Sequence, residues 1–323
     1  MRLASFRFED RDRIGAAQDD SRLVDLTGAL AELAGGAGAP RTLLELIEMG
    51  AAGLALARRA ADTTLSDPGQ RRYSAGEIVW QAPVRRPSKI CCLALNNSAN
   101  AERIMSGPKN PAMFIKPASS LTGHNQPIIC KPEYGRVHPE PELAVVIGTE
   151  AKNISAQRAY EHVFGYTILN DITSPSMRIE DTFHYRAIHP KAGNAAEVEY
   201  VDTWTSYPGR YKGCDTFACM GPWVVTRDEI PDPHNLRVQC HHQGRLVTED
   251  NTQNLFHKTP EVLAYLSRFT TLWPGDIVAL GTALRKSAAG GAVQNVDLAK
   301  LGGPVSVTIE KIGTLSNGVE HQR

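Results

Sequence analysis

The chain has 323 residues, of which 42% are hydrophobic, and this allows one large domain or a large domain with a small one. Lysine plus arginine equals aspartate plus glutamate at 35 each, so the formal net charge is zero at neutral pH. This balance argues against nucleic acid or a membrane surface as the main partner.

The six cysteines form no C-x-x-C pair and no cluster with zinc spacing. In a chain of this size we expect buried thiols in a reducing compartment. The first ten residues lack the apolar core of a secretory signal, and the longest apolar runs have the length of strands. These features predict a cytoplasmic protein.

Residues 1–82 predict a small N-terminal domain. Alternation over residues 1–8 predicts a strand, and residues 21–27 predict a second one. Between residues 42 and 61, leucine and alanine recur at helical spacing, which predicts one or two helices. A linker rich in proline and arginine then leads into a main domain at residues 86–323.

The main domain shows many short strand patterns separated by Pro, Gly and Asn turns. They lie at residues 89–95, 112–117, 127–132, 142–148, 165–171, 221–226, 236–244, 276–281 and 305–313. Two helices interrupt them, one after a predicted N-cap at Ser155 and one with its predicted N-cap at Thr259 and Pro260 at its first position. Because strands and helices do not alternate regularly, we predict a β-rich α+β fold and neither a Rossmann fold nor a β/α barrel.

Three acids stand at strand ends in the main domain. Glu140 and Glu142 begin an apolar strand, and their spacing places both carboxylates on one face. Asp171 ends the next predicted strand, and His138 shares the face of Glu140. Three converging carboxylates suit Mg²⁺, Mn²⁺ or Ca²⁺. From the pattern alone, salt-bridged surface acids remain the alternative.

Seven segments occur in an order that resembles the fumarylacetoacetate hydrolase family, over residues 89–323. They are PSKICCLALN, AMFIKPASSLTGHNQPI, PEPELAVVIG, AYEHVFGYTILNDITS, YKGCDTFACMGPWVVT, TLWPGDIVALGTA and VSVTIEKIGTLSN. The resemblance implies a mixed β-sandwich roll with a small N-terminal domain, assembled as a homodimer. It also implies a divalent cation, Mg²⁺ or Mn²⁺ (with Ca²⁺ possible in crystals), held by Glu140, Glu142 and Asp171, and a small 2-oxo acid as substrate.

The resemblance also assigns roles to further residues. Lys212 matches the family lysine and is expected to stabilise the anion that develops on the substrate. Thr282 matches the family threonine that holds the substrate carboxylate. Asn96 matches the asparagine that opens the water-activating motif of hydrolytic members, and we expect it to bind substrate.

The chain departs from the family pattern at that motif, which usually reads Asn-Tyr-x-x-His-x-x-Glu. Here Asn97, Asn100 and Arg103 occupy the Tyr, His and Glu positions, with Glu102 one place early. Asparagine cannot take a proton at neutral pH, so the usual dyad is missing. Glu102 could take the place of the missing glutamate if the local helix were shifted by one residue, which makes it a candidate base. The alternative is a solvated acid on the helix surface.

A second departure follows Asp171. Pro175 occupies an arginine position, and Arg178 occupies a position where the family has a substrate-facing glutamine. A guanidinium there would suit a substrate with an extra carboxylate, although it could equally pair with nearby acids. The long segment 179–211 carries His184 and His189 and could be a lid that supplies the missing base. His124, in the loop after residues 119–123, is a further candidate, although a single histidine is more often structural or exposed.

The leading hypothesis is a metal-dependent hydrolase that cleaves a carbon–carbon bond in a 2-oxo acid, either an acylpyruvate or a product of aromatic ring cleavage. The alternative is an isomerase, hydratase or decarboxylase that works through a metal-stabilised enolate, because this chemistry needs no activated water. A catalytically silent metal- or ligand-binding protein is the third possibility.

Overall fold

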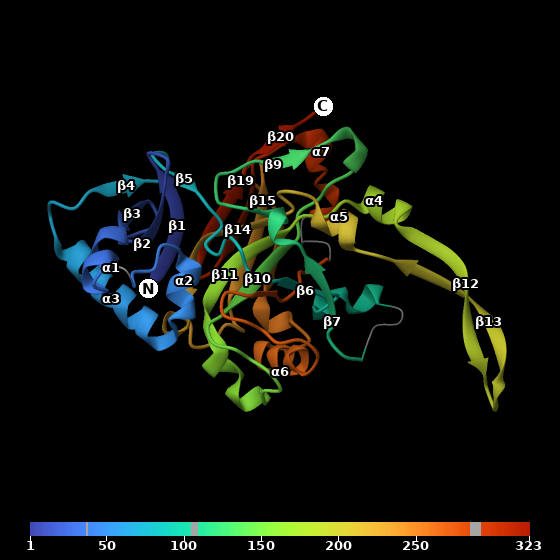
Figure 1. Ribbon diagram of the computed structural model, residues 1–323. Coiled ribbons are helices and arrows are strands. Elements are labelled where there is room, and N and C mark those ends of the chain that lie inside the picture. Colours follow the sequence, from blue (N-terminus) through green and yellow to red (C-terminus); the bar gives the residue numbers. More distant parts are fainter. Residues whose placement is uncertain (37, 105–108, 285–291) are drawn as a thin grey trace.

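The computed structural model describes the chain except for residues 37, 105–108 and 285–291, and the side chains of residues 101–103. It is β-rich with few helices, as predicted, and its main body is built on one large mixed sheet (Figure 1). A long two-stranded arm projects from this body.

The large sheet has 12 strands in the order β4-β3-β2-β1-β14-β11-β10-β17-β6-β7, with β5 paired to β1 and β8 paired to β14. The strands are β1 (Arg2–Phe8), β2 (Arg11–Ala17), β3 (Arg22–Asp25), β4 (Arg72–Ser74), β5 (Val79–Trp80), β6 (Ile90–Ala94), β7 (Ala112–Lys116), β8 (Leu121–Thr122), β10 (Pro141–Ile147), β11 (Val163–Asp171), β14 (Ala218–Thr226) and β17 (Ile277–Ala279).

A second sheet packs against the centre of the first one. Its four strands lie in the order β16 (Arg245–Asn251), β15 (Arg237–His242), β18 (Val305–Ile309) and β19 (Gly313–Asn317). β15, β18 and β19 contact β10, β11 and β14, which makes a two-layer sandwich. A small parallel pair, β9 (Ile128–Cys130) and β20 (Val319–His321), completes the body.

The α-helices are short apart from the third. They are α1 (Thr27–Leu33), α2 (Leu43–Glu48), α3 (Gly50–Ser66), α4 (Pro175–Glu180), α5 (Gly209–Gly213), α6 (Thr259–Phe269) and α7 (Leu298–Leu301). The prediction of one or two helices between residues 42 and 61 corresponds to α2 and α3, and α3 continues to Ser66. No helix in the described part of the chain combines the length and apolarity that crossing a membrane requires.

An α-helix was predicted after Ser155, and this prediction is wrong in the type of helix. Residues Ala156–His162 form a 3-10 helix, and β11 begins directly at Val163. The apolar residues that follow His162 belong to a strand buried on both faces, and this burial outweighs the local helical spacing. At the other predicted helix, the Glu261 carboxylate accepts a hydrogen bond from the Lys258 amide, so α6 is capped one residue earlier than expected.

Both faces of β10 are covered, which explains its continuous apolar sequence. Leu143, Val145 and Ile147 point into the layer between the two sheets. Ala144 and Val146 point to the opposite side, into the core that α2 and α3 share. The carboxylates that begin this strand therefore project from a rigid, packed element.

The N-terminal strands continue the large sheet. β1 pairs antiparallel with β14 through Arg2–Val225 and Leu3–Val224. The core beside α2 and α3 contains residues from both parts of the chain, such as Leu3 and Ala144. The division at residues 82–86 stays a prediction about folding units, since sheet and core run across it.

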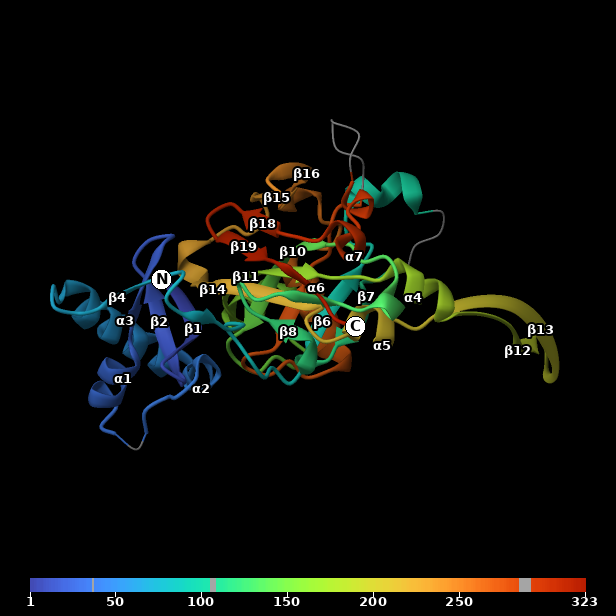
Figure 2. The same cartoon turned by 90° about the horizontal axis from the view of Figure 1, so that it is seen from above.

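Segment 179–211, considered above as a lid, does not fold over the body of its own chain. The segment instead forms β12 (Thr182–Lys191) and β13 (Asn194–Ser206), an antiparallel hairpin that points away from the body (Figures 1 and 2). It pairs with no other strand of the described chain. His184 stacks on Trp204, with ring centroids 4.2 Å apart, and belongs to the arm.

Candidate active site

The register between β10 and β11 brings the three predicted acids together. Pro141 lies opposite Asn170, and the Asp171 amide donates to the Glu140 carbonyl at 2.8 Å, so Glu140 and Asp171 are neighbours. Glu142 is two residues further along β10 and shares the face of Glu140. One carboxylate oxygen from each acid lies within 4.8 Å of the other two.

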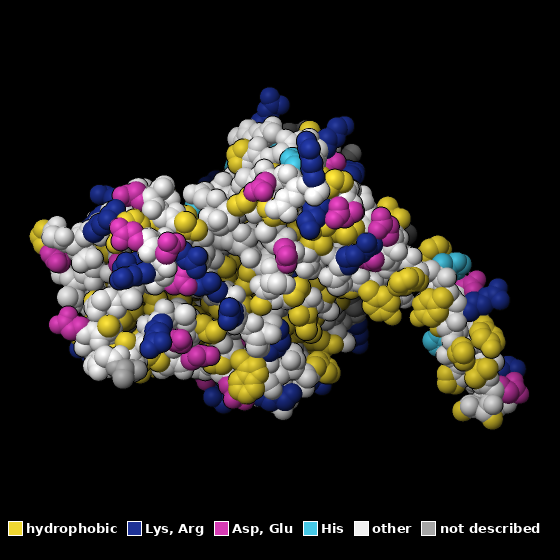
Figure 3. Space-filling model, turned by 45° about the horizontal axis from the view of Figure 1, so that its top comes forward, with side chains coloured by type: hydrophobic (Ala, Val, Ile, Leu, Met, Phe, Trp, Pro, Cys, Tyr) yellow, Lys and Arg dark blue, Asp and Glu magenta, His cyan; other side chains and the backbone are white. Residues whose placement is uncertain are grey.

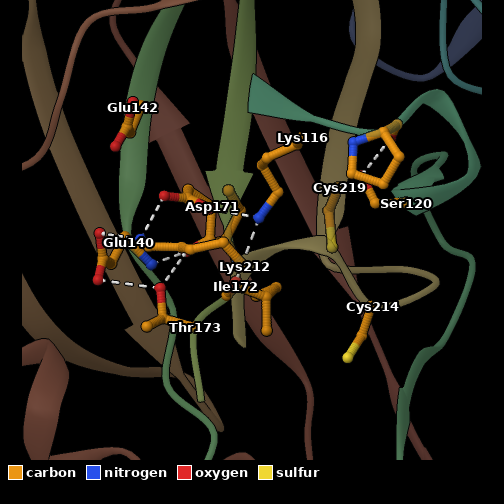
Figure 4. Close-up of polar contacts among 12 residues, drawn as sticks. Lys116, Ser120, Glu140, Glu142, Asp171, Ile172, Thr173, Lys212, Cys214 and Cys219 are labelled. Atoms are coloured by element: carbon orange, nitrogen blue, oxygen red, sulfur yellow. Dashed lines mark hydrogen bonds and ion pairs between the residues drawn. The ribbon is translucent and has the colours of Figure 1, made fainter. Parts of the chain in front are cut away.

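Two buried lysines contact these acids (Figure 4). The Lys212 ammonium donates to Asp171 Oδ2 at 2.5 Å and to Glu140 Oε2 at 3.0 Å. The Lys116 ammonium donates to Asp171 Oδ1 at 2.5 Å and to the Ile172 carbonyl at 3.3 Å. Asp171 is therefore held between two cations, one on α5 and one at the end of β7.

The sequence interpretation missed Lys116. The large sheet curls, so that β7 at one end of the strand order reaches β11 near the middle of it, and this brings Lys116 to Asp171. The only local signal is a lysine that alternates with Phe114 in an otherwise apolar strand. Such a lysine normally indicates a strand end in solvent.

The charges in this cluster do not balance. With all three carboxylates ionised, they face two ammonium groups, which would leave one excess negative charge. Burial and the charges of Asp171 and Glu140 raise the pKa of Glu142 well above its usual range. Glu142 accepts one hydrogen bond, from the Gly281 amide at 2.8 Å, and contacts neither lysine in the described structure.

The charged forms of Glu140 and Lys212 are stabilised by neighbouring charges. Burial alone would raise the pKa of Glu140, but Lys212 and His138 lower it overall. Burial alone would lower the pKa of Lys212, but Asp171 and Glu140 raise it overall. Glu142 is therefore the acid that lacks a cationic partner.

A divalent cation fits this arrangement. All three donors are carboxylate oxygens, which hard cations such as Mg²⁺ and Mn²⁺ prefer. A dication would supply the positive partner that Glu142 lacks and would favour its ionised form. With all three carboxylates ionised, the cluster and the dication together would carry one net positive charge. That charge suits an anionic substrate, and three protein ligands leave coordination positions for it.

Two side chains orient Glu140 from outside the cluster. His138 Nε2 lies 3.1 Å from Glu140 Oε1, and the Thr173 hydroxyl donates to the same oxygen at 3.0 Å. His138 and Thr173 also pair through their backbones, which links β10 to the residues after β11. Such contacts fix the direction of a metal ligand.

Asn100, in the histidine position of the family motif, has a structural role. Its side-chain amide donates to the Thr282 carbonyl at 3.1 Å, and its side-chain oxygen accepts from the Leu284 amide at 2.7 Å. The side chain is 1% exposed. Asn100 therefore holds the segment after β17 and offers no group that could take a proton from water.

Asn96 also bonds to the backbone. Its amide donates to the carbonyls of His257 and Leu280, and its oxygen accepts from the His257 amide at 2.8 Å. These bonds position the end of β17 beside the site. A direct substrate contact for Asn96 stays a prediction.

The Thr282 hydroxyl is buried and has no hydrogen-bond partner among the described residues. An unpaired buried hydroxyl is unfavourable unless a ligand satisfies it. This placement is compatible with the predicted role of Thr282 as a carboxylate contact.

Arg178 lies on α4 and is exposed. The nearby acids that were its alternative partners, Glu180 and Asp181, bind Arg210. The helix that carries Arg178 meets the one that carries Lys212, because the Ser174 amide donates to the Tyr211 carbonyl at 3.0 Å. Arg178 thus lies on a helix that adjoins the one carrying Lys212, and its substrate role stays a prediction.

Glu102 and His124 are the two remaining candidates for a catalytic base. The backbone of Glu102 lies in a 3-10 helix, Ser98–Arg103, but its side chain is outside the described part of the chain. His124 accepts a hydrogen bond from the Ser316 amide and packs against Trp80, so it belongs to the core of the body.

Comparisons with known proteins show the family of the chain. Residues 89–320 match the family model for the C-terminal domain of fumarylacetoacetate (FAA) hydrolase. A mitochondrial oxaloacetate tautomerase of Bos taurus is 34% identical over 87% of this chain and 80% of its own length. The oxaloacetate tautomerase YisK of Bacillus subtilis is 31% identical over 99% of this chain and 100% of its own.

One similar protein of known structure was solved with a bound metal ion. Maleylpyruvate hydrolase from Sphingobium sp. SYK-6, in complex with manganese(II) and pyruvate, is 27% identical, with a TM-score of 0.71 over 100% of both chains.

Proposed function

Because the chain belongs to the fumarylacetoacetate hydrolase family, we propose that it catalyses the keto–enol tautomerisation of a 2-oxo dicarboxylate of the oxaloacetate class. The observation that carries this proposal is the role of Asn100, whose side chain is fixed by two backbone groups. Tautomerisation moves a proton between a carbon and the 2-oxo oxygen, so it needs no activated water.

The chain's own cations favour a doubly charged substrate. When held by Glu140, Glu142 and Asp171, a divalent cation would act as a Lewis acid that stabilises an enolate. The Lys212 ammonium uses two of its three hydrogens on Glu140 and Asp171, which leaves one for a substrate oxygen. Because its pKa is raised, Lys212 keeps that proton throughout the neutral range.

Lys116 adds a second positive charge at the other carboxylate oxygen of Asp171. The Phe114 ring, 5.1 Å from the Lys212 ammonium, provides an apolar wall beside it. The substrates named for the relatives from Bos taurus and Bacillus subtilis are of this dicarboxylate class. We infer Mg²⁺ or Mn²⁺ as the metal, and the cytoplasm stays the predicted location.

Hydrolysis of a carbon–carbon bond is the second candidate, because the manganese-bound structural neighbour is a hydrolase. Product analysis separates the two. A tautomerase speeds equilibration between the enol and keto forms without changing the mass of the substrate. A hydrolase acting on maleylpyruvate or an acylpyruvate yields two fragments, and one of them carries ¹⁸O from labelled water.

Asn100→His tests the role that the proposal gives to Asn100. We expect no cleavage product, because the site is not arranged to activate water. We also expect the free energy of unfolding to fall by about 1–3 kcal/mol, because the two ring nitrogens of imidazole do not coincide with the amide nitrogen and oxygen that bind Thr282 and Leu284. Denaturant unfolding and mass spectrometry measure the two effects. A variant that gains carbon–carbon hydrolysis at wild-type stability would contradict the proposal.

Thr282→Val should separate substrate binding from stability. The hydroxyl has no partner among the described residues, so its removal should leave the unfolding free energy within about 0.5 kcal/mol of the wild type. A hydrogen bond to a charged carboxylate contributes about 1.5–3 kcal/mol, so KM should rise at least 10-fold. Thr282→Ser is the matched control and should retain most of the affinity. An unchanged KM in the valine variant would remove Thr282 from the site.

A further inference from the structure

A hollow of about 490 Å³ lies where β6 ends and β7 begins. Its apolar lining includes Ala94 and Leu95 beside β6, Ala112 on β7, and Phe256 from the segment before α6. An apolar cavity of about 150 Å³ is enough to bind benzene. The hollow therefore has room for a ligand group of the size of an aromatic ring.

The hollow lies on the same face of the large sheet as the two lysines of the site. Ala94 and Ala112 are register partners, and Phe114, two residues after Ala112, lies with its ring 5.1 Å from the Lys212 ammonium. Residues two apart on a strand share a face, so Ala112 faces the side on which Phe114 and Lys116 lie.

The strand register also places the hollow at the level of Glu142. β17 lies between β10 and β6, and these three strands are paired through the row Ala144, Ala279 and Cys92. Two residues further along each strand are Glu142, Gly281 and Ala94. Adjacent strands are about 4.8 Å apart, so the lining at Ala94 begins roughly 10 Å from Glu142. A ligand bound at the metal-binding acids can extend over this distance into the hollow.

Asn96 connects the wall of the hollow to the backbone of the site. Its side chain bonds to the amide and the carbonyl of His257, and its own carbonyl accepts from the Phe256 amide at 3.3 Å. The same side chain donates to the Leu280 carbonyl at 2.9 Å, one residue before Gly281. These bonds hold the wall in a fixed position, so a ligand that spans both parts meets a preformed surface.

Leu95 has a backbone conformation that leucine rarely adopts. Its φ is 56°, in the left-handed region. Its side chain is 45% exposed, and that of Phe256 is 47% exposed. A strained residue of this kind is typical of positions that contact a ligand. Here the strain keeps an apolar side chain at the hollow that the chain itself does not cover.

Exposed apolar side chains also run along the arm of β12 and β13 (Figure 3). The arm points away from the body, whereas the hollow adjoins the acids of the site. The hollow, and not the arm, is therefore placed to contact a substrate held by those acids.

We propose that the hollow binds an apolar group, of the size of a phenyl ring, that the substrate carries on the carbon next to its 2-oxo group. The head of the 2-oxo acid would lie at the three acids, and the apolar group would contact Leu95 and Phe256. Lys109 and His257 also line the hollow, and none of its described lining residues is acidic, so an anionic substrate is not repelled. The inference rests on the proposed function in one respect, the binding of a 2-oxo acid head at the metal site.

The test compares the binding of pyruvate and phenylpyruvate, which differ by one phenyl ring, to the full-length protein loaded with Mn²⁺. Titration calorimetry measures both dissociation constants. Burial of an aromatic ring tightens binding by about 10- to 100-fold, so phenylpyruvate should bind at least 10-fold more tightly than pyruvate. Oxalate should displace both ligands, because it occupies the position of their shared head.

Leu95→Asn and Phe256→Ala each remove an apolar contact from the hollow. Both should weaken phenylpyruvate binding by roughly 5-fold or more and leave the affinity for pyruvate unchanged. Asparagine adopts the left-handed conformation more readily than leucine, so Leu95→Asn should not lower the unfolding temperature. Phe269→Ala, at an exposed position on α6, is the matched control and should change neither affinity.

The outcomes separate this inference from the proposed function. Mn²⁺-dependent binding of pyruvate without tighter binding of phenylpyruvate would overturn the inference and leave the proposed function standing. Phenylpyruvate binding that oxalate does not displace, or that Leu95→Asn leaves unchanged, would also overturn it. If Phe256→Ala fails to fold, Leu95→Asn decides. A protein that binds neither ligand when loaded with Mn²⁺ would contradict both.

Discussion

Lys212→Met is expected to lower kcat by about 10²–10³-fold while divalent-cation binding is retained. The wild-type ammonium contacts Glu140 and Asp171 and has a third hydrogen available for the substrate. Loss of one positioned donor to a developing anion typically costs this much. Removal of a positive charge makes the carboxylate cluster more negative, so the affinity for Mn²⁺ should stay equal or rise.

Steady-state kinetics with saturating Mn²⁺ and titration calorimetry measure these two quantities. Lys300→Met, which removes an exposed lysine from α7, is the control and should match the wild type in both. A Lys212→Met enzyme with near-normal kcat would exclude Lys212 as the anion-stabilising group. Loss of Mn²⁺ binding would instead show that Lys212 maintains the geometry of the metal site.

Glu142→Gln should have opposite effects on function and on stability. Without metal, the Glu142 carboxylate is buried and contacts no cation among the described residues, so a neutral amide of the same shape should raise the unfolding free energy. We expect an increase larger than the roughly 0.5 kcal/mol scatter of surface substitutions. Activity should fall at least 10²-fold, because a charged ligand of the metal is lost.

The same substitution should change how stability depends on pH. The folded-state pKa of Glu142 is raised above its unfolded value, so burial of its neutral form contributes stability at low pH that is lost as pH rises past the unfolded value. Metal-free Glu142→Gln should lack this part of the decline. Denaturant unfolding from pH 4 to 8, with and without Mn²⁺, measures it. If the metal-free variant were less stable than the metal-free wild type at pH 7, Glu142 would not be a buried acid without a cationic partner.

Glu150→Gln on the surface serves as the matched control for both measurements. It removes one carboxylate of the same type from an exposed position. It should change neither activity nor the pH dependence of unfolding beyond experimental scatter.

The metal-binding acids could be located from the sequence because their signals are local. Strand alternation places Glu140 and Glu142 on one face, and an acid at the end of the next strand forms an antiparallel neighbour. The register then puts Asp171 opposite Glu140. The family resemblance added the role of Lys212, which lies on a short helix that sequence periodicity alone does not reveal.

Other features depend on long-range geometry. Lys116 reaches Asp171 only because the large sheet curls, and no local pattern encodes that curvature. The role of Asn100 as a backbone clamp requires the segment after β17 to lie beside it, 182 residues further along the chain. The arm was considered as a lid because its length was visible in the sequence, whereas its direction depends on how α4 and α5 pack.

The central claim is that Glu140, Glu142 and Asp171 hold a divalent cation between them. A crystal structure of the wild type soaked with Mn²⁺ and oxalate, with anomalous data collected above the manganese edge, tests it most directly. The account predicts one strong peak, with one oxygen of each carboxylate at about 2.0–2.6 Å and oxalate on the open side. Carboxylates that point apart with no anomalous peak between them would contradict it.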